Sequence, residues 1–337
     1  WTIANIIRTG FSSYPFLMTG HTSEAMKDSI ARQLDNNTFD LVHVETFYVM
    51  QNLPSIKKLP LVLAEQNIEY SVYKRYADHA RFLLKHLFFI DVLKMKQWEE
   101  KYWRRANWIV VTTENEKKEV KKYNEHVAII PNGVDLNTFR AQKSEGARFA
   151  NGIRRKEKTI LFIGDFRWVE NKDAVTWLLT VIWPKLKLKA TSEELKMKLW
   201  IVGKQIPEAI KLLTDDPDVR FDENAPNDTR EIYKNADVLL APIRVGSGGK
   251  FKILENMASY VPVVTTTIGI EGIEAKDRDS IIIADEVEDL VAKTVEILKD
   301  DALYKKISLS ARKLIEEKYE WGRIVRNLEK VYESVTK

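Results

Sequence analysis

The sequence predicts a doubly wound α/β protein of two lobes, and three observations lead to this prediction. Short apolar runs rich in β-branched residues recur along the chain, each followed by a stretch long enough for an amphipathic helix. The runs are continuous rather than alternating, as strands buried on both faces of a parallel sheet require. The chain has 337 residues, more than a single core usually organises, so two domains are expected.

Four of the runs precede residue 135 and six follow it. The strands predicted in the first lobe are Phe39–Val44, Pro60–Ala64, Trp108–Thr112 and Val127–Ile130. Those predicted in the second lobe are Thr159–Ile163, Leu199–Val202, Val219–Phe221, Val238–Ala241, Val261–Thr265 and Ser280–Ala284. Helical crossovers return the chain to the same edge of a sheet, so the alternation predicts two parallel, Rossmann-like sheets.

The division between the lobes is predicted after Pro131–Asp135, where a strand ends in turn residues and polar sequence follows. We expect an N-terminal lobe over residues 1–140, a second lobe over 141–318 and a closing helix over 319–337. The first lobe contains no strand followed by a glycine-rich turn, with which a doubly wound domain usually opens. Because the chain also begins at Trp1 without a Met, the first lobe is expected to lack its beginning.

Composition excludes several kinds of site. There is no cysteine, which rules out thiolate catalysis, Cys-ligated zinc, iron–sulfur clusters and disulfides. The five histidines show no HxH or HxxxH spacing, so no metal site is expected. A net charge of +4 is too small to indicate nucleic acid. No stretch resembles a membrane span or a secretory leader, and a cytoplasmic location is expected.

The segment from Ala241 to Val264 carries the clearest chemical signal. A predicted strand leads to Arg244 and then to a glycine-rich turn, which stands directly before a predicted helix and consists of Gly246, Ser247, Gly248 and Gly249. Glycines there let the backbone approach an anion, and the helix N-terminus favours phosphate. Lys250 and Lys252 add positive charge, and the carboxylate of Glu255 is placed to accept hydrogen bonds from ribose hydroxyls. A nucleoside diphosphate site is predicted; a glycine turn that serves packing alone is the alternative.

This segment resembles a known family. KILENMA, which contains Glu255, followed by VPVVT, is similar to the retaining glycosyltransferases of family 4, which have the two-lobed GT-B fold and an E-x7-E segment in this place. The resemblance implies that Glu255 binds the donor ribose. Ser247 stands at the position of the first Glu, the donor-sugar contact, as in a subgroup with a G-x-G-x-x-x-K-x-L-E-A-M-A-like pattern.

Other segments resemble the same subgroup, which extends the resemblance over about residues 38–335. FIGDFRWVENKDAV, residues 162–175, is similar to the segment that follows the first strand of the second lobe. At the position of the family's diphosphate-binding Arg this sequence has Asp165. Lys250 is the first candidate to bind the diphosphate instead, and Arg167 or Lys172 are the next candidates. The resemblance also implies that no metal ion and no cofactor besides the nucleotide-sugar substrate are needed.

In the first lobe, His43 and Glu45 stand at the end of a predicted strand, where the edge of a parallel sheet faces the ligand. They are candidate catalytic residues, together with Lys250; a purely structural histidine is the alternative for His43. Glu65–Glu69, the sequence EQNIE, resembles a family segment EHNIE, and Gln66 in place of His excludes acid–base catalysis at that position.

Residues 74–105 hold nine Lys or Arg and four Asp or Glu among many apolar residues. A helix that buries its apolar face in the lobe is the preferred interpretation. The alternative is a basic surface that makes peripheral contact with the inner face of the membrane, near a lipid-linked acceptor.

Together these features predict a glycosyltransferase of the hexosyltransferase type. It would move a sugar from a nucleotide-sugar donor to an unidentified glycan or lipid-linked acceptor with retention, in the synthesis of cell-surface polysaccharide or glycolipid. The alternatives are a nucleotide-sugar epimerase of the same fold and a non-catalytic nucleotide-sugar-binding protein.

Overall fold

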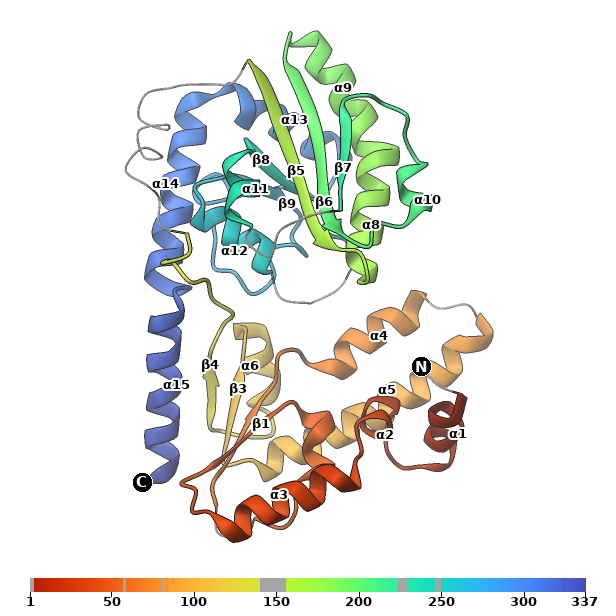
Figure 1. The fold of residues 1–337 in the computed structure, drawn as a ribbon, viewed down its shortest axis with the longest axis vertical. Coiled ribbons are helices and arrows are strands. Elements are labelled where there is room, and N and C mark those ends of the chain that lie inside the picture. The colour runs from red at the N-terminus through yellow and green to blue at the C-terminus, as the bar shows by residue number, and fades with distance from the viewer. Residues whose placement is uncertain (1–2, 57–58, 80–81, 140–155, 224–228, 246–249) are drawn as a thin grey trace. The chain divides into compact units, whose positions relative to one another are not determined.

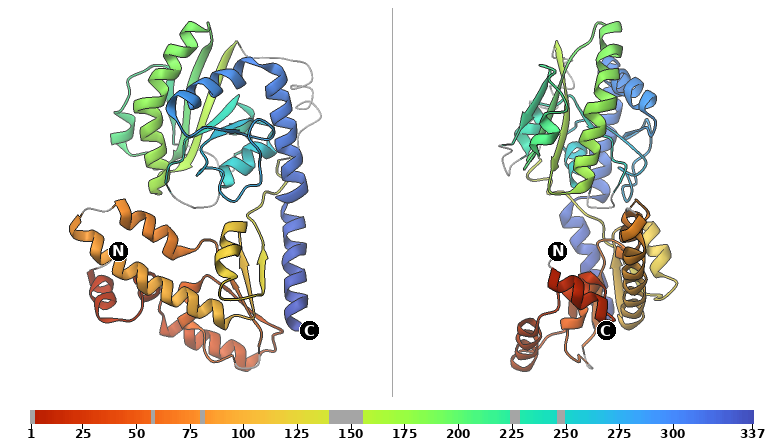
Figure 2. Two further views of the ribbon diagram at one scale, coloured as in Figure 1. Left: turned by 180° about the vertical axis from the view of Figure 1, so that it is seen from behind. Right: turned by 90° about the vertical axis from the view of Figure 1, so that its right-hand side faces the viewer.

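The computed structural model describes residues 3–56, 59–79, 82–139, 156–223, 229–245 and 250–337, and it divides into two compact units. Unit 1 comprises residues 1–131 and 325–337, and unit 2 comprises residues 132–324. The predicted fold class is confirmed, because each unit contains a parallel sheet with helices between its strands (Figures 1 and 2). All predicted strands are present, four in one sheet and six in the other.

Unit 1 is built on a parallel sheet with the strand order β1-β2-β3-β4. The strands are β1 (Val42–Glu45), β2 (Leu61–Ala64), β3 (Trp108–Val111) and β4 (Val127–Ile129). All side chains of β2 are buried, as its continuous apolar sequence predicts for a strand covered on both faces. In β1, an edge strand of this sheet, three side chains are half-buried and Glu45 is exposed.

The helices of unit 1 bury an aromatic core against this sheet. They are α1 (Ile3–Phe11), α2 (Phe16–Gly20), α3 (Glu24–Asn36), the 3-10 helix η1 (Phe47–Asn52), α4 (Glu69–His79), α5 (Phe82–Arg105) and α6 (Glu114–Val120). Helix α5 contributes Met95, Tyr102 and Trp103 to the core. The last helix, α15 (Trp321–Thr336), places Val331 in a second cluster with Val62 of this sheet.

Unit 2 contains a parallel sheet with the order β10-β9-β8-β5-β6-β7. Its strands are β5 (Glu157–Asp165), β6 (Lys196–Lys204), β7 (Val219–Asp222), β8 (Val238–Ala241), β9 (Val263–Thr265) and β10 (Ile282–Ile283). From β5 the chain moves to β6 and β7, then returns to the other side of β5 and continues outward from β8. The strand order therefore reverses between β5 and β8, and in open α/β sheets ligands bind outside the carboxyl ends of the strands at such a point.

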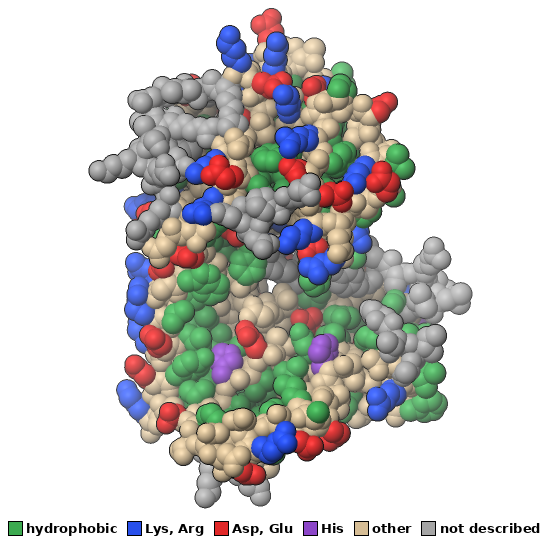
Figure 3. All heavy atoms as spheres, viewed as in Figure 1, with side chains coloured by type: hydrophobic (Ala, Val, Ile, Leu, Met, Phe, Trp, Pro, Cys, Tyr) green, Lys and Arg blue, Asp and Glu red, His purple; other side chains and the backbone are tan. Residues whose placement is uncertain are grey.

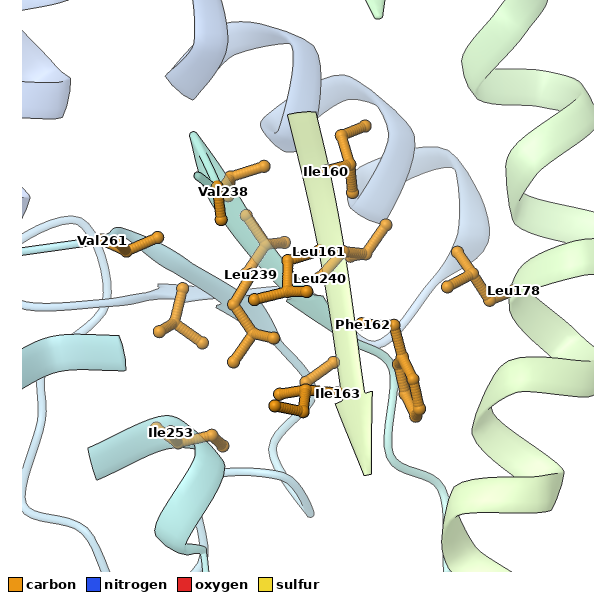
Figure 4. Packing of buried hydrophobic residues seen from close by; sticks show 14 of the residues in the cluster. Ile160, Leu161, Phe162, Ile163, Leu178, Val238, Leu239, Leu240, Ile253 and Val261 are labelled. Atoms are coloured by element: carbon orange, nitrogen blue, oxygen red, sulfur yellow. The ribbon is translucent and has the colours of Figure 1, made fainter. Parts of the chain in front are cut away.

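Helices cover both faces of the unit 2 sheet. They are α8 (Val169–Trp177), the π-helix η2 (Leu178–Ile182), α9 (Trp183–Ser192), α10 (Glu208–Lys211), α11 (Arg230–Lys234), α12 (Phe251–Ala258), α13 (Val287–Lys299) and α14 (Asp301–Lys318). Helices α9 and α13 lie on one face, and α11 and α12 on the other (Figure 2). Residues 160–163 of β5 lie in the centre of the core between them (Figure 4).

Two glycines let the central strands of unit 2 approach closely at their carboxyl ends. Gly164 of β5 and Gly203 of β6 are register partners. A Cβ atom on Gly203 would lie 2.0 Å from the carbonyl oxygen of Gly164, and one on Gly164 would lie 2.7 Å from the side chain of Asn171. At Gly203 the backbone itself requires glycine, and at Gly164 the packed side chain of Asn171 does.

The structure places the division between residues 131 and 132, whereas the sequence predicts it after Pro131–Asp135, with the first lobe extending to residue 140. Backbone hydrogen bonds explain the difference. The amide of Val134 donates to the carbonyl of Tyr319 at 2.7 Å, and the amide of Trp321 donates to the carbonyl of Val134 at 3.2 Å. These bonds hold the segment after Pro131 against the last turn before α15, within unit 2.

Candidate functional site

The candidate site of unit 2 lies where two helices begin at the reversal point of the sheet. Helix α8 follows β5 with Trp168 as its N-cap, and α12 follows β8 with Lys250 as its N-cap. The first turns of both helices, whose N–H groups have no acceptor within the helix, therefore lie at the carboxyl edge of adjacent strands. Such N-termini favour negative charge, which agrees with the predicted phosphate site.

Lys252 and Asn171 connect the two helices. The Lys252 ammonium donates to Asn171 Oδ1 at 2.5 Å, and Asn171 Nδ2 donates to the carbonyl of Asp165 at 2.8 Å. The Lys252 Nζ atom also lies 4.8 Å from the centroid of the Phe162 ring. Burial lowers the pKa of Lys252 to about 7. This lysine is therefore held in position by groups that come from β5 and α8.

The two candidate arginines are engaged in ion pairs with carboxylates. Arg244 binds Asp173 of α8, with its Nε and NH2 atoms at 3.1 and 2.7 Å from the carboxylate, and its guanidinium lies 4.4 Å from the centroid of the Trp177 ring. Arg167 pairs with Asp165, two residues before it, through Nε and NH2. On the face shown in Figure 3, basic and acidic side chains of unit 2 are similarly interspersed. Both arginines would therefore have to exchange a carboxylate for a donor phosphate.

Glu255 lies on α12 and is held through one carboxylate oxygen. Tyr233 OH donates to Oε2 at 2.5 Å, and Thr229 Oγ1 donates to the same atom at 3.3 Å. Among the described residues, no hydrogen bond to Oε1 is present. Burial raises the pKa of Glu255, and the two hydrogen bonds oppose this rise. The side chain is thus held through Oε2 by a hydroxyl of α11 and one of the residue before it.

The predicted glycine turn lies outside the described residues. It comprises Gly246, Ser247, Gly248 and Gly249, and its roles stay predictions. Lys250, the residue that follows it, is half-buried at the N-cap of α12. The chain before these residues comes from the carboxyl end of β8, and the chain after them begins α12.

In unit 1, His43 and Glu45 lie on β1, and each has a hydrogen-bond partner from another segment of the unit. His43 Nδ1 lies 2.7 Å from Tyr332 OH of α15, and the two rings pack edge to face. Burial lowers the pKa of His43, and the nearby Glu45 carboxylate opposes this effect. Gln66 Nε2 donates to Glu45 Oε1 at 2.7 Å. His43 therefore has a structural contact in addition to its predicted catalytic role.

Two fully buried carboxyl groups of unit 1 serve the fold. Glu65 Oε1 accepts from the indole N–H of Trp103 at 3.0 Å, and Glu99 accepts from the amides of Glu69 and Tyr70, at 2.8 and 2.9 Å, at the start of α4. Burial raises the pKa of both glutamates above the ordinary value. Residue 65, the first position of the EQNIE segment, is thus enclosed in the core.

Within the described part of the chain, no group of three or more His, Asp or Glu side chains is arranged to hold a metal ion. In the same part, no helix is long and apolar enough to span a membrane.

The structure brings Arg244, Lys252 and Glu255 to one edge of unit 2 and gives each a partner that sequence reasoning did not identify. These partners are Asp173, Asn171, and Tyr233 with Thr229. Asn171 and Asp173 lie in the segment FIGDFRWVENKDAV, so the resemblance marked the region without assigning their contacts. No sequence signal connects Tyr233 with Glu255, because their contact depends on how α11 packs against α12.

Two family models match consecutive parts of the chain. Residues 4–138 match the model described as Glycosyltransferase Family 4, and residues 157–300 match the model described as Glycosyl transferases group 1.

Two curated proteins are similar in sequence to part of the chain. One is an uncharacterized 44.6 kDa protein in the cps region of Klebsiella pneumoniae, which is 25% identical over 177 residues. This match covers 50% of the present chain and 44% of that protein. The other is N-acetyl-alpha-D-glucosaminyl L-malate synthase of Bacillus anthracis, 24% identical over 229 residues, which covers 66% of the chain and 57% of that protein. The chain thus spans about half the length of these relatives.

Solved structures share the two-lobed fold. Sucrose-phosphate synthase from Thermosynechococcus elongatus is similar with a TM-score of 0.66 and 15% identity, over 91% of this chain and 76% of that one. HepE from Anabaena, solved with UDP and glucose, gives a TM-score of 0.65 and 13% identity over 92% and 81% of the two chains. TarM from S. aureus, solved as a mutant with Fondaparinux, alpha-GlcNAc-glycerol and UDP, gives a TM-score of 0.65 and 16% identity. The match covers 91% of this chain and 58% of that one. At these identities the likeness establishes the fold alone.

Proposed function

We propose that this chain is a glycosyltransferase, because a Glycosyltransferase Family 4 region is followed here by a Glycosyl transferases group 1 region in a GT-B fold. It transfers a sugar from a nucleoside-diphosphate donor to a glycan or lipid-linked acceptor, with retention at the anomeric carbon. The acceptor belongs to cell-surface polysaccharide or glycolipid synthesis. The names of similar proteins support this proposal, because one of them was solved with UDP and glucose and another with UDP and a glycan.

The observation that carries the proposal is the geometry of Glu255. Its Oε2 atom is held by Tyr233 and Thr229, and the side chain lies on the helix that begins at Lys250. A carboxylate that is fixed through one oxygen can accept a ribose hydroxyl on the other without losing further side-chain entropy. The N-terminus of the same helix then lies on the side where the diphosphate of that nucleotide would be.

The protein contributes to this reaction mainly by placing charge where the leaving group develops charge. As the bond between the sugar and the diphosphate breaks, negative charge grows on the departing phosphate oxygen. Lys250, Lys252 and the N–H groups at the start of α12 are in place before the reaction begins. They stabilise the charge as it grows, so these protein groups need to move little during the reaction. This role requires no metal ion. His43 and Glu45 stay candidates for contact with the acceptor.

Replacing Lys250 by alanine is expected to lower kcat by roughly 100-fold, because one cation beside the leaving diphosphate is lost. The measurement is sugar transfer from a panel of nucleotide sugars to a panel of glycan and lipid-linked acceptors. Lys313→Ala provides a matched control, because Lys313 is an exposed lysine of α14 with a weak ion pair to Glu317. Unchanged turnover in the Lys250 variant would remove its assigned role.

The same assay separates the alternatives. An epimerase would convert the donor without any acceptor, and a non-catalytic protein would bind nucleotide sugars without forming product. Transfer that depends on an acceptor supports the proposal, and a product in which the anomeric configuration is inverted would contradict retention.

We also propose peripheral contact with the inner face of the cytoplasmic membrane through residues 74–105. The stripe Leu87, Ile90 and Leu93 of α5 is 64%, 54% and 60% exposed, while the opposite side of the helix lies in the core. Helix α5 therefore carries apolar side chains on two sides. Basic residues outnumber acidic ones in this range, which complements anionic lipid headgroups. The cytoplasmic location stays a prediction.

Changing Leu87, Ile90 and Leu93 together to serine is expected to weaken binding to anionic vesicles by roughly 10-fold or more, because exposed apolar area is lost. Co-sedimentation with vesicles that contain phosphatidylglycerol, compared with pure phosphatidylcholine, measures this. The matched control changes Leu188 and Leu212 of unit 2, which are 74% and 78% exposed. Equal vesicle binding by the triple variant and the unmodified protein would show that the stripe has another role.

A further inference from the structure

Lys252 is a partly buried lysine whose ammonium group is incompletely paired. Among the described residues, Asn171 Oδ1 at 2.5 Å is its one hydrogen-bond acceptor, and it forms no ion pair. A charged lysine carries three N–H donors, so two of them have no partner there. The face of the Phe162 ring, 4.8 Å from Nζ, provides weaker attraction for a cation than a carboxylate does.

The charged neighbours of Lys252 come from two helices and act in opposite directions. Glu170 of α8 favours the ammonium form, and Lys250 of its own helix opposes it. The groups that contact the Lys252 Nζ atom directly are uncharged: Phe162 of β5 and Asn171 of α8. Burial is the largest influence, and with these neighbours it brings the pKa of Lys252 to about 7. Above neutral pH much of this side chain is therefore the uncharged amine.

Lys252 differs in this respect from the two candidate arginines. Arg167 and Arg244 are already neutralised by Asp165 and Asp173. Guanidinium groups stay charged at all accessible pH values, so these pairs have no proton to exchange. An amine that lacks a counter-ion can instead change its charge when an anion arrives.

We propose that Lys252 takes up one proton from solvent when a nucleoside diphosphate binds beside it, so that donor binding and protonation of this lysine are linked. This inference rests on the proposed donor site of unit 2. The bound diphosphate supplies the missing counter-charge and acceptors for the two remaining N–H groups. The proton moves from water or buffer to Nζ, and no covalent bond to the ligand forms. The uncharged amine avoids the cost of an unpaired cation in the empty site.

The number of protons taken up on binding increases with pH, and the affinity for the diphosphate decreases. Below pH 6 Lys252 is already protonated, so binding takes up almost no proton. At pH 8 the empty site is mostly unprotonated, and binding takes up most of one proton. Affinity for the diphosphate is therefore expected to fall by about tenfold for each pH unit above 7, until the pKa of the bound state is reached.

Isothermal titration calorimetry with UDP and with GDP tests this in two buffers without phosphate at each pH, MES and bis-Tris at pH 6, and HEPES and Tris at pH 8. The two buffers differ in ionisation enthalpy, so the difference in observed heat gives the number of protons taken up. The matched variant is Lys252→Arg, which keeps a cation that does not titrate. It should bind the diphosphate with no proton uptake at pH 8. Binding by the unmodified protein without uptake, or uptake that persists in Lys252→Arg, would overturn the inference.

A measurement on the ligand-free protein separates this inference from the proposed function. The 13C NMR signal of the Lys252 Cε atom, assigned by its loss in Lys252→Arg, reports the titration directly. A midpoint near that of ordinary lysine would overturn the inference even if nucleotides bind. Failure of every nucleoside diphosphate to bind would instead overturn the proposed donor site, and the linkage with it.

Discussion

Replacing Glu255 by alanine is expected to lower kcat/KM for the donor by roughly 100-fold, or about 3 kcal/mol, mainly through a higher KM. The reason is that hydrogen bonds between a carboxylate and hydroxyl groups contribute more than neutral ones, and the substitution removes the group that is proposed to bind the ribose. The truncation also leaves Tyr233 OH, which is buried, without its acceptor. Steady-state transfer kinetics with varied donor concentration measure both parameters.

Glu255→Gln distinguishes recognition from folding. Its amide oxygen can still accept from Tyr233 and Thr229, while an NH2 group replaces the oxygen that faces the ligand. This variant is expected to fold like the unmodified protein and still to lose most donor affinity. Glu288→Gln is the control, because Glu288 is an exposed glutamate of α13 that pairs with Lys185. A Glu255→Gln variant with an unaltered donor KM would contradict the ribose assignment.

Replacing Gly203 by alanine is expected to destabilise unit 2 by about 3 kcal/mol or more. The new Cβ atom would lie 2.0 Å from the carbonyl oxygen of Gly164 and 2.6 Å from the ring of Phe166. The first of these neighbours is backbone in a central strand, which cannot move without disturbing the pairing of β5 with β6. Because Asn171 packs directly over Gly164, the same displacement would alter the contact between Asn171 and Lys252.

Urea denaturation followed by circular dichroism measures the loss, as a lower midpoint at an unchanged slope. Gly10→Ala is the matched control, since a Cβ atom on this glycine of α1 meets nothing within 4 Å. That change is expected to be neutral or to stabilise the helix by up to about 1 kcal/mol. Equal midpoints for Gly203→Ala and the unmodified protein would show that the two strands can separate at little cost.

Several parts of the candidate site follow from the sequence because they depend on local order. The Ala241–Val264 segment places a strand, a turn and a helix in succession, so Lys250, Lys252 and Glu255 must lie near a helix N-terminus. The structure has the strand, β8, and the helix, α12, on either side of residues 246–249, which lie outside the described residues. The partners of Lys252 and Glu255 lie 81 and 22 residues away along the chain, at Asn171 and Tyr233. Local pattern carries no information on such distances.

For residues 74–105, the sequence did not indicate which side of the helix is buried. The apolar residues of α5 were expected to lie on a buried face, yet Leu87, Ile90 and Leu93 are exposed, while Met95 and Trp103 are buried. Helical periodicity identifies a stripe only when polar residues mark the other side, and this run is apolar on both. Which side meets the core depends on the position of the sheet.

The sequence by itself determined the ten strands, the parallel sheets and the region of the candidate site, because continuous apolar runs and turn residues act over short distances. The tertiary structure alone decided the charge state of that region. It pairs Arg244 with Asp173, 71 residues away along the chain, and it leaves Lys252 with one amide acceptor among the described residues. Coulomb interactions and desolvation depend on distances through space, and for Arg244 and Lys252 these are set by how the residues after β8 pack against α8 rather than by separation along the chain.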